Sequence, residues 1–451
     1  MKKMKLKLAV LVPALLILGI SLESCASSSN DLEEPKQEEL NNAEQTAKGI
    51  VCATDTYHTV LPSPTEKFDS AQWDLVWGDE FDYPDAALEN KWTSQNNSSG
   101  HILCSRWREN AVVANGVLEL QAKKEQRGGQ DWTCGNIWTK ETFSYGYYEA
   151  KYKYAGASGT NNSFWLFSNE KGVGNNSAGV TCELDVNEGH FPNEINTNRH
   201  HWENGSSESN QLAYTEGLSP GYAHTLKESV KTKRIRFSSN NASHFHIREF
   251  RIYEAKSDCS FPLDIQSDTA DTAVTGLNNL SKDSQVTITS SGVLNDTYDV
   301  SDIADGSTTT SWVSQKNGEK WLEFNWPSEK NIGHIQFVNG WKSGTNWNAL
   351  ISDYKIEAYV NNQWVEIGSY DVKKEYNYAN DYHLYGMEWS ANEIKFYFDN
   401  KLIRTIPNNL CNEELNIYLS LAILDHAGEV TDAIDGTSMK IDYVKYFRRK
   451  Q

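Results

Sequence analysis

Three acidic residues stand close together in one segment that reads like a β-strand. Residues 181–190 are Thr-Cys-Glu-Leu-Asp-Val-Asn-Glu-Gly-His, so Glu183, Asp185 and Glu188 follow the pattern Glu-x-Asp-x-x-Glu. Two carboxyls that converge on a sugar linkage can split a glycosidic bond, one as an ionised nucleophile and the other as an acid and then a base. The alternative is a solvated strand face without chemistry.

The spacing of the three acids requires an irregularity in the strand if all three are to lie on one face. Side chains alternate between the two faces of a strand, so Glu183 and Asp185 share a face and Glu188 falls on the other. One bulge residue between Asp185 and Glu188 would restore the alternation and align all three. Because neighbouring carboxyls cannot all ionise at low cost, we expect one raised pKa and one proton retained at neutral pH.

Further segments occur in an order and at spacings that are typical of a known family. Together with the acidic pattern they resemble glycoside hydrolase family 16, in the form found in its laminarinase, agarase, porphyranase and carrageenase branches. The segments that carry the resemblance are 73–81, 116–120, 135–140, 143–151, 162–166, 382–389, 394–402 and 439–446.

The resemblance implies a fold, a reaction and a division of labour. The implied fold is all-β, a concanavalin-like jelly-roll sandwich formed by residues 71–204 and 376–451. Glu183 would be the nucleophile, Glu188 the general acid/base, and Asp185 the group that holds and tunes Glu183. Catalysis would need no cofactor. A structural calcium on the convex side is a further implication, for which Asp442 is the matching carboxylate.

Several residues near the acidic segment are candidates for contacts with a sugar. An indole packs well against the C–H face of a pyranose, so we expect Trp165 to form an aromatic floor, with a core position as the alternative. His200 and His201 are adjacent and must face opposite ways on a strand, and the sequence does not say which one faces the cleft. The other candidates for substrate binding are Arg106, Trp138, His190 and Arg199.

Residues 205–375 are not needed by the family and form a predicted insertion. Parts of it, among them 302–312 and 320–324, resemble a discoidin (factor 5/8 type C) β-sandwich. The segments that usually come last in that domain come first here, at 233–237 and 247–253, which indicates a circular permutation. The alternative is an intact discoidin-like module at 260–375 behind an unrelated hairpin. Its loop residues Trp341, Asn346 and Trp347 could contact sugar or serve only as structure.

The first residues read as an export signal. Lysines precede an apolar run that ends before Leu22-Glu-Ser-Cys25, which resembles a bacterial lipoprotein signal over 1–24 with Cys25 as the lipidated residue. Ordinary secretion and an uncleaved anchor are the alternatives. Residues 25–70 then read as a flexible tether. We expect a lipid-anchored protein at the outer membrane or cell surface of a Gram-negative-type bacterium, with the periplasmic face as an alternative.

Charge and cysteine content limit the partners. The net charge of -19 makes nucleic acid an unfavourable partner, and we expect a monomer. Any sulfate recognition would need local cations such as Arg106, Arg108, Lys140 or Arg199. An exported chain permits disulfides, of which we predict Cys104–Cys134, whereas Cys182 reads as a buried structural thiol.

The expected substrate is an extracellular β-linked polysaccharide. The Gly-His-Phe-Pro sequence after the acidic pattern, with Arg and His around it, favours a red-algal galactan of the agar, porphyran or carrageenan type. The alternative is a β-1,3- or mixed-linkage β-glucan. A catalytically silent, glycan-binding surface lipoprotein is the alternative of another class, and the three intact acids argue against it.

Overall fold

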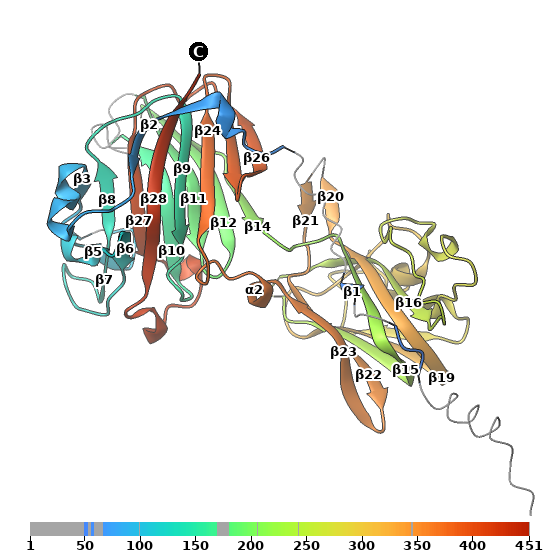
Figure 1. The fold of residues 1–451 in the computed structure, drawn as a ribbon. Coiled ribbons are helices and arrows are strands. Elements are labelled where there is room, and N and C mark those ends of the chain that lie inside the picture. The colour runs from blue at the N-terminus through green and yellow to red at the C-terminus, as the bar shows by residue number, and fades with distance from the viewer. Residues whose placement is uncertain are drawn as a thin grey trace, which may run out of the picture. The chain divides into compact units, whose positions relative to one another are not determined.

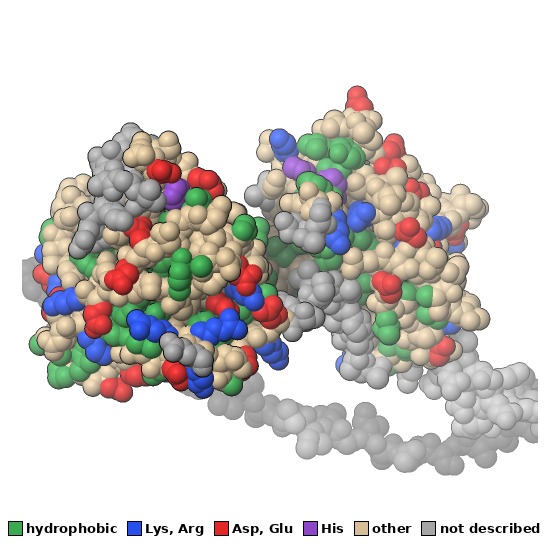
Figure 2. Space-filling view, turned by 90° about the horizontal axis from the view of Figure 1, so that it is seen from above, with side chains coloured by type: hydrophobic (Ala, Val, Ile, Leu, Met, Phe, Trp, Pro, Cys, Tyr) green, Lys and Arg blue, Asp and Glu red, His purple; other side chains and the backbone are tan. Residues whose placement is uncertain are grey.

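The computed structural model describes residues 49–52, 56–57, 66–98, 100–168, 180–204, 206–241, 243–343 and 346–450. The predicted signal segment 1–24 and Cys25 lie outside these residues, so the lipid anchor stays a prediction. Within the described ranges, no helix has the length and apolar character that a membrane span requires. Figure 2 shows acidic and basic side chains interspersed over the visible surface.

Two antiparallel sheets form the first body and lie as two layers (Figure 1). The order in the first sheet is β13-β12-β11-β10-β27-β8-β3, with β14 beside β12. Its strands are β3 (Trp92–Ser94), β8 (Asn136–Thr139), β10 (Thr160–Phe167), β11 (Val180–His190), β12 (Glu194–Glu203), β13 (Ser206–Ser209), β14 (Leu212–Thr215) and β27 (Asn416–Ile423).

The second layer has the order β26-β25-β24-β9-β28-β6-β5, with β2 beside β28. Its strands are β2 (Trp73–Asp79), β5 (Ala111–Ala114), β6 (Val117–Gln121), β9 (Gly146–Lys153), β24 (His383–Trp389), β25 (Glu393–Phe398), β26 (Lys401–Pro407) and β28 (Ser438–Arg449). A short parallel pair, β4 (Cys104–Arg106) and β7 (Trp132–Cys134), lies outside both orders. The predicted jelly-roll sandwich is therefore confirmed.

Alternating side chains explain how the first sheet presents a core face and an open face. Phe164 and Leu166 of β10 and Leu184 of β11 are fully buried in a core shared with the second layer. Trp165 lies between Phe164 and Leu166 and is partly exposed. Since side chains alternate along a strand, Trp165 belongs to the face opposite the core.

A separate sheet lies between the two parts of the first body in the sequence. It has the order β18-β16-β19-β15-β22-β23 and its own apolar core, which includes Tyr222, Phe237 and Phe337. Its strands are β15 (Gly221–Ser239), β16 (His246–Glu254), β17 (Thr287–Ser290), β18 (Trp312–Val313), β19 (Lys320–Asn339), β22 (Asp353–Val360) and β23 (Gln363–Asp371), and a hairpin joins β20 (Trp341–Ser343) to β21 (Asn346–Asn348).

In the residues that the structure describes, helical structure is confined to short turns. They are η1 (Ser70–Gln72), η2 (Asp85–Asn90), η3 (Arg108–Asn110), η5 (Ala270–Thr272), η6 (Leu280–Lys282), η7 (Val300–Ala304), η8 (Asp425–Ala427), η9 (Asp432–Ile434) and the single α-helical turn α2 (Val372–Glu375).

Two predicted boundaries are corrected by strand pairing. The insertion was expected to begin at 205, but β13 and β14 pair with β12 and extend the first body to Thr215. The tether was expected to run to 70, but β1 (Thr56–Tyr57) pairs with β15 through Thr225 and His224. Cys52, in the same segment, is disulfide-bonded to Cys259. Short polar segments carry too little apolar pattern for such pairing to be read from sequence.

Three disulfides join the cysteines of the described chain. The predicted pair Cys104–Cys134 is confirmed. Cys182 is not the free buried thiol that was expected, because it is bonded to Cys411, 229 residues away. The partner was hidden from sequence reasoning because distant cysteines meet only through the fold. This bond ties β11, the strand with the acids, to the segment that leads into β27.

Loss of the Cys182–Cys411 bond is expected to destabilise the protein. Replacing both cysteines by serine should lower the free energy of unfolding by about 2–4 kcal/mol, because the open chain gains entropy in the unfolded state. Urea unfolding under non-reducing conditions measures this. The Cys104→Ser/Cys134→Ser variant is the control and should lose about 1–2 kcal/mol less, since its bond closes only 30 residues. A larger loss in the control would contradict the argument.

Candidate active site

A bulge in β11 brings the three acids to one face. Asp185 lies opposite Asn198 of β12, but the next paired residue is Glu188, opposite Asn196, and the register shifts between them. On the other side, Trp165 of β10 pairs with Asp185 and Ser163 pairs with Glu188. Because paired residues share a face, Glu183, Asp185 and Glu188 all lie on the open side of the sheet. The predicted bulge is confirmed.

Buried partners beneath the bulge fix the backbone that carries Glu188. Asn187 points into the core, where its amide donates hydrogen bonds to the hydroxyls of Tyr152 and Tyr154 at 2.6 and 2.8 Å. Gly189 follows, and a Cβ there would lie 2.3 Å from the Tyr154 hydroxyl oxygen. Only glycine permits this close approach. Glu188 is thus held on a rigid support.

The acids line a pocket of about 260 Å³ on this open face. Asn161 of β10 donates from Nδ2 to Glu188 Oε1 at 3.2 Å, which orients that carboxyl. The lining also contains residues from the loop before β4 and from the end of β27. In full, the lining residues are His101, Ile102, Arg106, Asn161, Ser163, Trp165, Glu183, Asp185, Glu188, Ser420, Ala422, Leu424 and His426.

Proximity and burial raise the pKa values of two of the acids. Burial and then repulsion from Glu188 raise the pKa of Glu183 to about 8, while a hydrogen bond with Asp185 lowers it. The pKa of Asp185, whose side chain is 2% exposed, is raised well above its usual value by burial and by both neighbouring carboxylates. A proton on Asp185 can be donated to Glu183 and so favours the ionised form of Glu183. The titration steps belong to the cluster as a whole.

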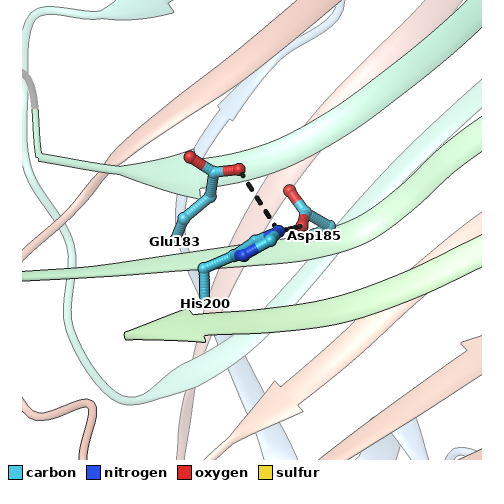
Figure 3. Close-up of side chains that lie close together, drawn as sticks. All are labelled: Glu183, Asp185 and His200. Carbon is cyan, nitrogen blue, oxygen red and sulfur yellow. Dashed lines mark ion pairs between the residues drawn. The ribbon is translucent and has the colours of Figure 1, made fainter. Parts of the chain in front are cut away.

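His200 faces the acids, which settles the choice between the adjacent histidines (Figure 3). Its Nε2 lies 3.5 Å from Asp185 Oδ2 and 4.0 Å from Glu183 Oε1. Burial lowers the pKa of His200, so the ring is neutral at pH 7. Asn198 Nδ2 lies 2.7 Å from the same Nε2, and because an amide nitrogen donates, that ring nitrogen accepts.

Glu183, Asp185 and His200 also have the ligand types of a metal site, with ligand atoms all within 4.8 Å of one another. A metal here would occupy the carboxyl needed as a nucleophile and would displace the Asn198 hydrogen bond. This geometry therefore fits a metal-free acid cluster better. Asp442, the predicted calcium ligand, instead pairs with Lys151 at 2.8 Å. Among the described residues, Asp442 does not belong to a group of three potential metal ligands, and the calcium site stays a prediction.

Aromatic rings form a row across the open face. Trp165 and Trp138 both lie against Tyr418 of β27, with ring centroids 4.3 and 5.5 Å away. The row continues from Trp165 to Phe167 at 5.9 Å and from Phe167 to Trp202 at 6.4 Å. Trp165 Nε1 donates to Ser420 Oγ at 3.1 Å, which fixes the ring. Trp138, Trp165 and Trp202 are partly exposed and offer apolar platforms for a chain of sugar rings, while Tyr418 and Phe167 are buried between them.

The structure brings most of the predicted contact residues to this face but not all. His190 pairs with Asn161 on the open side and lies 3.1 Å from Glu194, and Arg106 lines the pocket. Arg199 pairs with Leu184 and His201 with Cys182, so both face the opposite side. Arg199 and His201 are corrected as cleft residues. Both are immediate neighbours of His200 on β12, so they point to the opposite face. Without the pairing register, the sequence does not say which of the alternating residues face the cleft.

Several residues of the pocket and of the open face beside it were missed by sequence reasoning. Tyr418 and Ser420 come from β27, far along the chain, and nothing local marks them as neighbours of Trp165. Asn161 lies two residues before Ser163 on β10, so its face could have been derived once the direction of Trp165 was assumed. His101 and His426 lie on loops, for which no period applies.

The raised pKa of Glu183 has a consequence for stability. Its pKa is raised to about 8 in the fold against 4.5 for the free side chain, and that of Asp185 is raised as well, so between these values the folded cluster holds a proton that the unfolded carboxyls have released. This contribution to stability is therefore complete below pH 4.5 and is lost as the pH rises to 8.

Glu183→Gln should thus stabilise the protein, and more at pH 9 than at pH 5. The difference in unfolding free energy between variant and parent should grow by at least about 1 kcal/mol over that interval. Thermal and urea unfolding at both values measure it. Glu203→Gln, which removes an exposed carboxyl from β12, is the matched control. A gain that does not change with pH would contradict the expected burial.

A family model matches the chain over most of its described length. The family is described as Glycosyl hydrolases family 16, and the match covers residues 101–286 and 342–445. The matched ranges include every residue that lines the pocket.

The names of individual proteins that resemble the chain refer to different glycans. A beta-glucanase from Rhodothermus marinus is 30% identical over 124 residues, which cover 26% of this chain and 43% of that protein. A kappa-carrageenase from Pseudoalteromonas carrageenovora is 35% identical over 108 residues, which cover 20% of this chain and 25% of that protein. The chain thus spans less than half the length of these curated relatives.

A solved laminarinase catalytic domain from Thermotoga petrophila RKU-1 is also similar. It is 15% identical with a TM-score of 0.43, and the alignment covers 84% of this chain and 99% of that one.

Proposed function

We propose, since the chain belongs to family 16 of the glycosyl hydrolases, that it is an endo-acting glycoside hydrolase that cleaves a β-linked polysaccharide with retention of the anomeric configuration. The observation that carries this proposal is the alignment of three carboxyls on one face by the β11 bulge, beside a row of aromatic rings. A retaining mechanism needs one carboxyl to attack and another to donate a proton.

In the first step, a Glu183 carboxylate oxygen attacks the anomeric carbon while Glu188 gives its proton to the departing glycosidic oxygen. The bond to the leaving sugar breaks and an ester bond to Glu183 forms. Asp185 donates a hydrogen bond to Glu183 and so favours the ionised nucleophile. Asn161 holds the Glu188 carboxyl through its 3.2 Å hydrogen bond.

In the second step, Glu188 removes a proton from water, and the water oxygen attacks the same anomeric carbon. The ester bond breaks, Glu183 leaves as a carboxylate, and Glu188 is protonated again. Two displacements at one carbon restore the original configuration. Atoms and charges balance without a cofactor.

We favour a red-algal galactan as the substrate, with a β-glucan as the second candidate. The presence of Arg106 in the pocket suits a substituted galactan, and a kappa-carrageenase is among the similar proteins. The similarity to a beta-glucanase, at 30% identity, supports the glucan alternative.

Reducing-end release by the purified protein tests both candidates. The polymers are agarose, porphyran, κ-carrageenan, laminarin and mixed-linkage β-glucan, each also treated with the Glu183→Gln variant. We expect release from at least one galactan and none by the variant. Release from laminarin or mixed-linkage glucan alone would select the glucan reading. Binding without release on all five would show a silent glycan-binding protein.

We further propose that the second sheet is a circularly permuted discoidin-like sandwich. Residues 233–237 lie within β15 and 247–253 within β16, and both strands pair with β19, which follows them in sequence. That pairing is expected if the usual last strands have moved to the front. An experimental structure in which β19 pairs with neither strand would contradict it.

A further inference from the structure

Arg106 is a buried cation in the acid pocket, and no ion pair was found for it in the part of the chain that the structure describes. Its side chain is 6% exposed, and its Nε has no hydrogen-bond partner. It is the one lysine or arginine among the residues that line the pocket. A guanidinium removed from water without a counter-charge is costly, so its retention points to a partner that is bound there at work.

The backbone around Arg106 is fixed on both sides. Its amide and carbonyl each form a 2.9 Å hydrogen bond with Asn97. Arg106 also ends β4, which pairs with β7 opposite Cys134, and the Cys104–Cys134 disulfide joins the same two strands. A side chain on such a support loses little freedom when it binds a ligand.

The chemistry beside Arg106 suits an oxyanion. A guanidinium presents planar N–H donors that match the oxygens of sulfate or carboxylate groups. His101 lies close enough that the Arg106 charge, after burial, lowers its pKa, so its ring is neutral at pH 7 and keeps one N–H donor. The remaining charged groups of the pocket are carboxyls, which would repel an anionic sugar unless a cation offsets them.

We propose that Arg106 binds an anionic substituent, a sulfate ester or a carboxylate, on a sugar unit next to the cleaved bond. This inference rests on the proposed function, because it places a polysaccharide in the same pocket. It makes Arg106 a residue that selects charged over neutral polymers. The other role for a lone cation here is to offset the carboxyl cluster, which would affect neutral and charged polymers alike.

Binding measured by calorimetry on the Glu183→Gln protein tests this without hydrolysis. The probes are oligosaccharides of porphyran for sulfate, of hyaluronan for carboxylate and of agarose as the neutral galactan. We expect porphyran or hyaluronan to bind more tightly than agarose. Adding Arg106→Gln should lower that ratio of affinities about tenfold to a hundredfold, the effect of losing hydrogen bonds to a charged group. The polymer whose ratio falls identifies the anion.

Two further variants keep the result interpretable. Arg106→Lys retains the charge but not the planar fork, so it should recover part of the ratio. Lys124→Gln removes an exposed cation outside the pocket lining and should leave the ratio unchanged. Thermal unfolding of each variant shows that it folds.

An unchanged ratio in Arg106→Gln, or no preference for either anionic probe over agarose, would overturn the inference. These failures are separable from failure of the proposed function. If the parent protein hydrolyses any polymer and Arg106→Gln leaves the ratio of affinities unchanged, only the role of Arg106 is rejected. A ratio that depends on Arg106, with no hydrolysis of any polymer, would reject the proposed reaction and keep the anion site.

Discussion

Replacing Glu183 by glutamine is expected to lower kcat/KM on the cleaved polymer at least about a thousandfold, because the amide cannot form the ester intermediate. The side chain keeps its size, and Asp185 and His200 remain around it. The loss should appear in the rate of bond cleavage and not in affinity, since the change removes a step and not a contact. Steady-state reducing-end assays, with binding measured separately, give both quantities.

The matched control for this variant is Glu203→Gln. It makes the same chemical change on the neighbouring strand β12, at an exposed position outside the pocket lining. The control should keep the activity of the parent protein. A small azide ion added to Glu183→Ala should restore cleavage by attacking in place of the missing carboxylate. Activity of Glu183→Gln within tenfold of the parent would contradict the assignment of the nucleophile.

Replacing Glu188 by glutamine is expected to lower kcat/KM on polymer by about 10² to 10⁴, the usual contribution of a positioned acid/base. The loss should depend on the leaving group. In a glycoside of the same sugar with an acidic phenol as the leaving group, the phenolate departs without a proton. The rate of the first step on that substrate should therefore be nearly unchanged in the variant. The variant should then accumulate the ester intermediate, because no base activates the water of the second step.

A burst of phenol release followed by a slow steady state measures this behaviour. Parallel assays on polymer and on the activated glycoside separate the two roles of Glu188. Asn161→Ala is an informative companion, because it leaves the carboxyl but removes the 3.2 Å hydrogen bond that orients it. Asn161→Ala should lower kcat/KM on polymer less than Glu188→Gln does, and it should show no burst of phenol release. Equal losses for Glu188→Gln on both substrates would count against the assignment.

Sequence reasoning reached the acids because their constraint is local. The spacing of Glu183, Asp185 and Glu188 requires a bulge within one strand, and the register shift lies where the spacing demands it. The aromatic floor at Trp165 was expected from the family resemblance and from the packing of an indole on a sugar ring, and alternation along β10 places Trp165 on the open face. The all-β sandwich was implied by the family resemblance, and the alternating pattern of the strand segments agrees with it.

The features that were missed depend on which strands meet. Tyr418 lies beside Trp165 only because β27 pairs with β10, and Cys411 reaches Cys182 only in the folded chain. Arg199 and the adjacent His200 and His201 were candidates for the cleft because they lie near the acids in sequence. Pairing with β11 turns Arg199 and His201 to the opposite face and leaves His200 facing the acids. Sequence alone shows that side chains alternate along a strand more readily than it shows which of them face the cleft.

The acid cluster illustrates a cost that function imposes on stability. Burial raises the pKa values of Glu183 and Asp185 and makes their ionisation unfavourable in the fold. The same effect keeps a proton in the site near neutral pH. A variant that gains stability and loses activity together is the expected signature of such a site.

The stereochemistry of the first product tests the central claim most directly. Proton NMR of the cleaved polymer, recorded before mutarotation, identifies the anomeric configuration of the new reducing end. The proposed double displacement through Glu183 predicts that the β anomer appears first and the α anomer only later. Initial appearance of the α anomer would show a single displacement and would contradict the roles assigned to both Glu183 and Glu188.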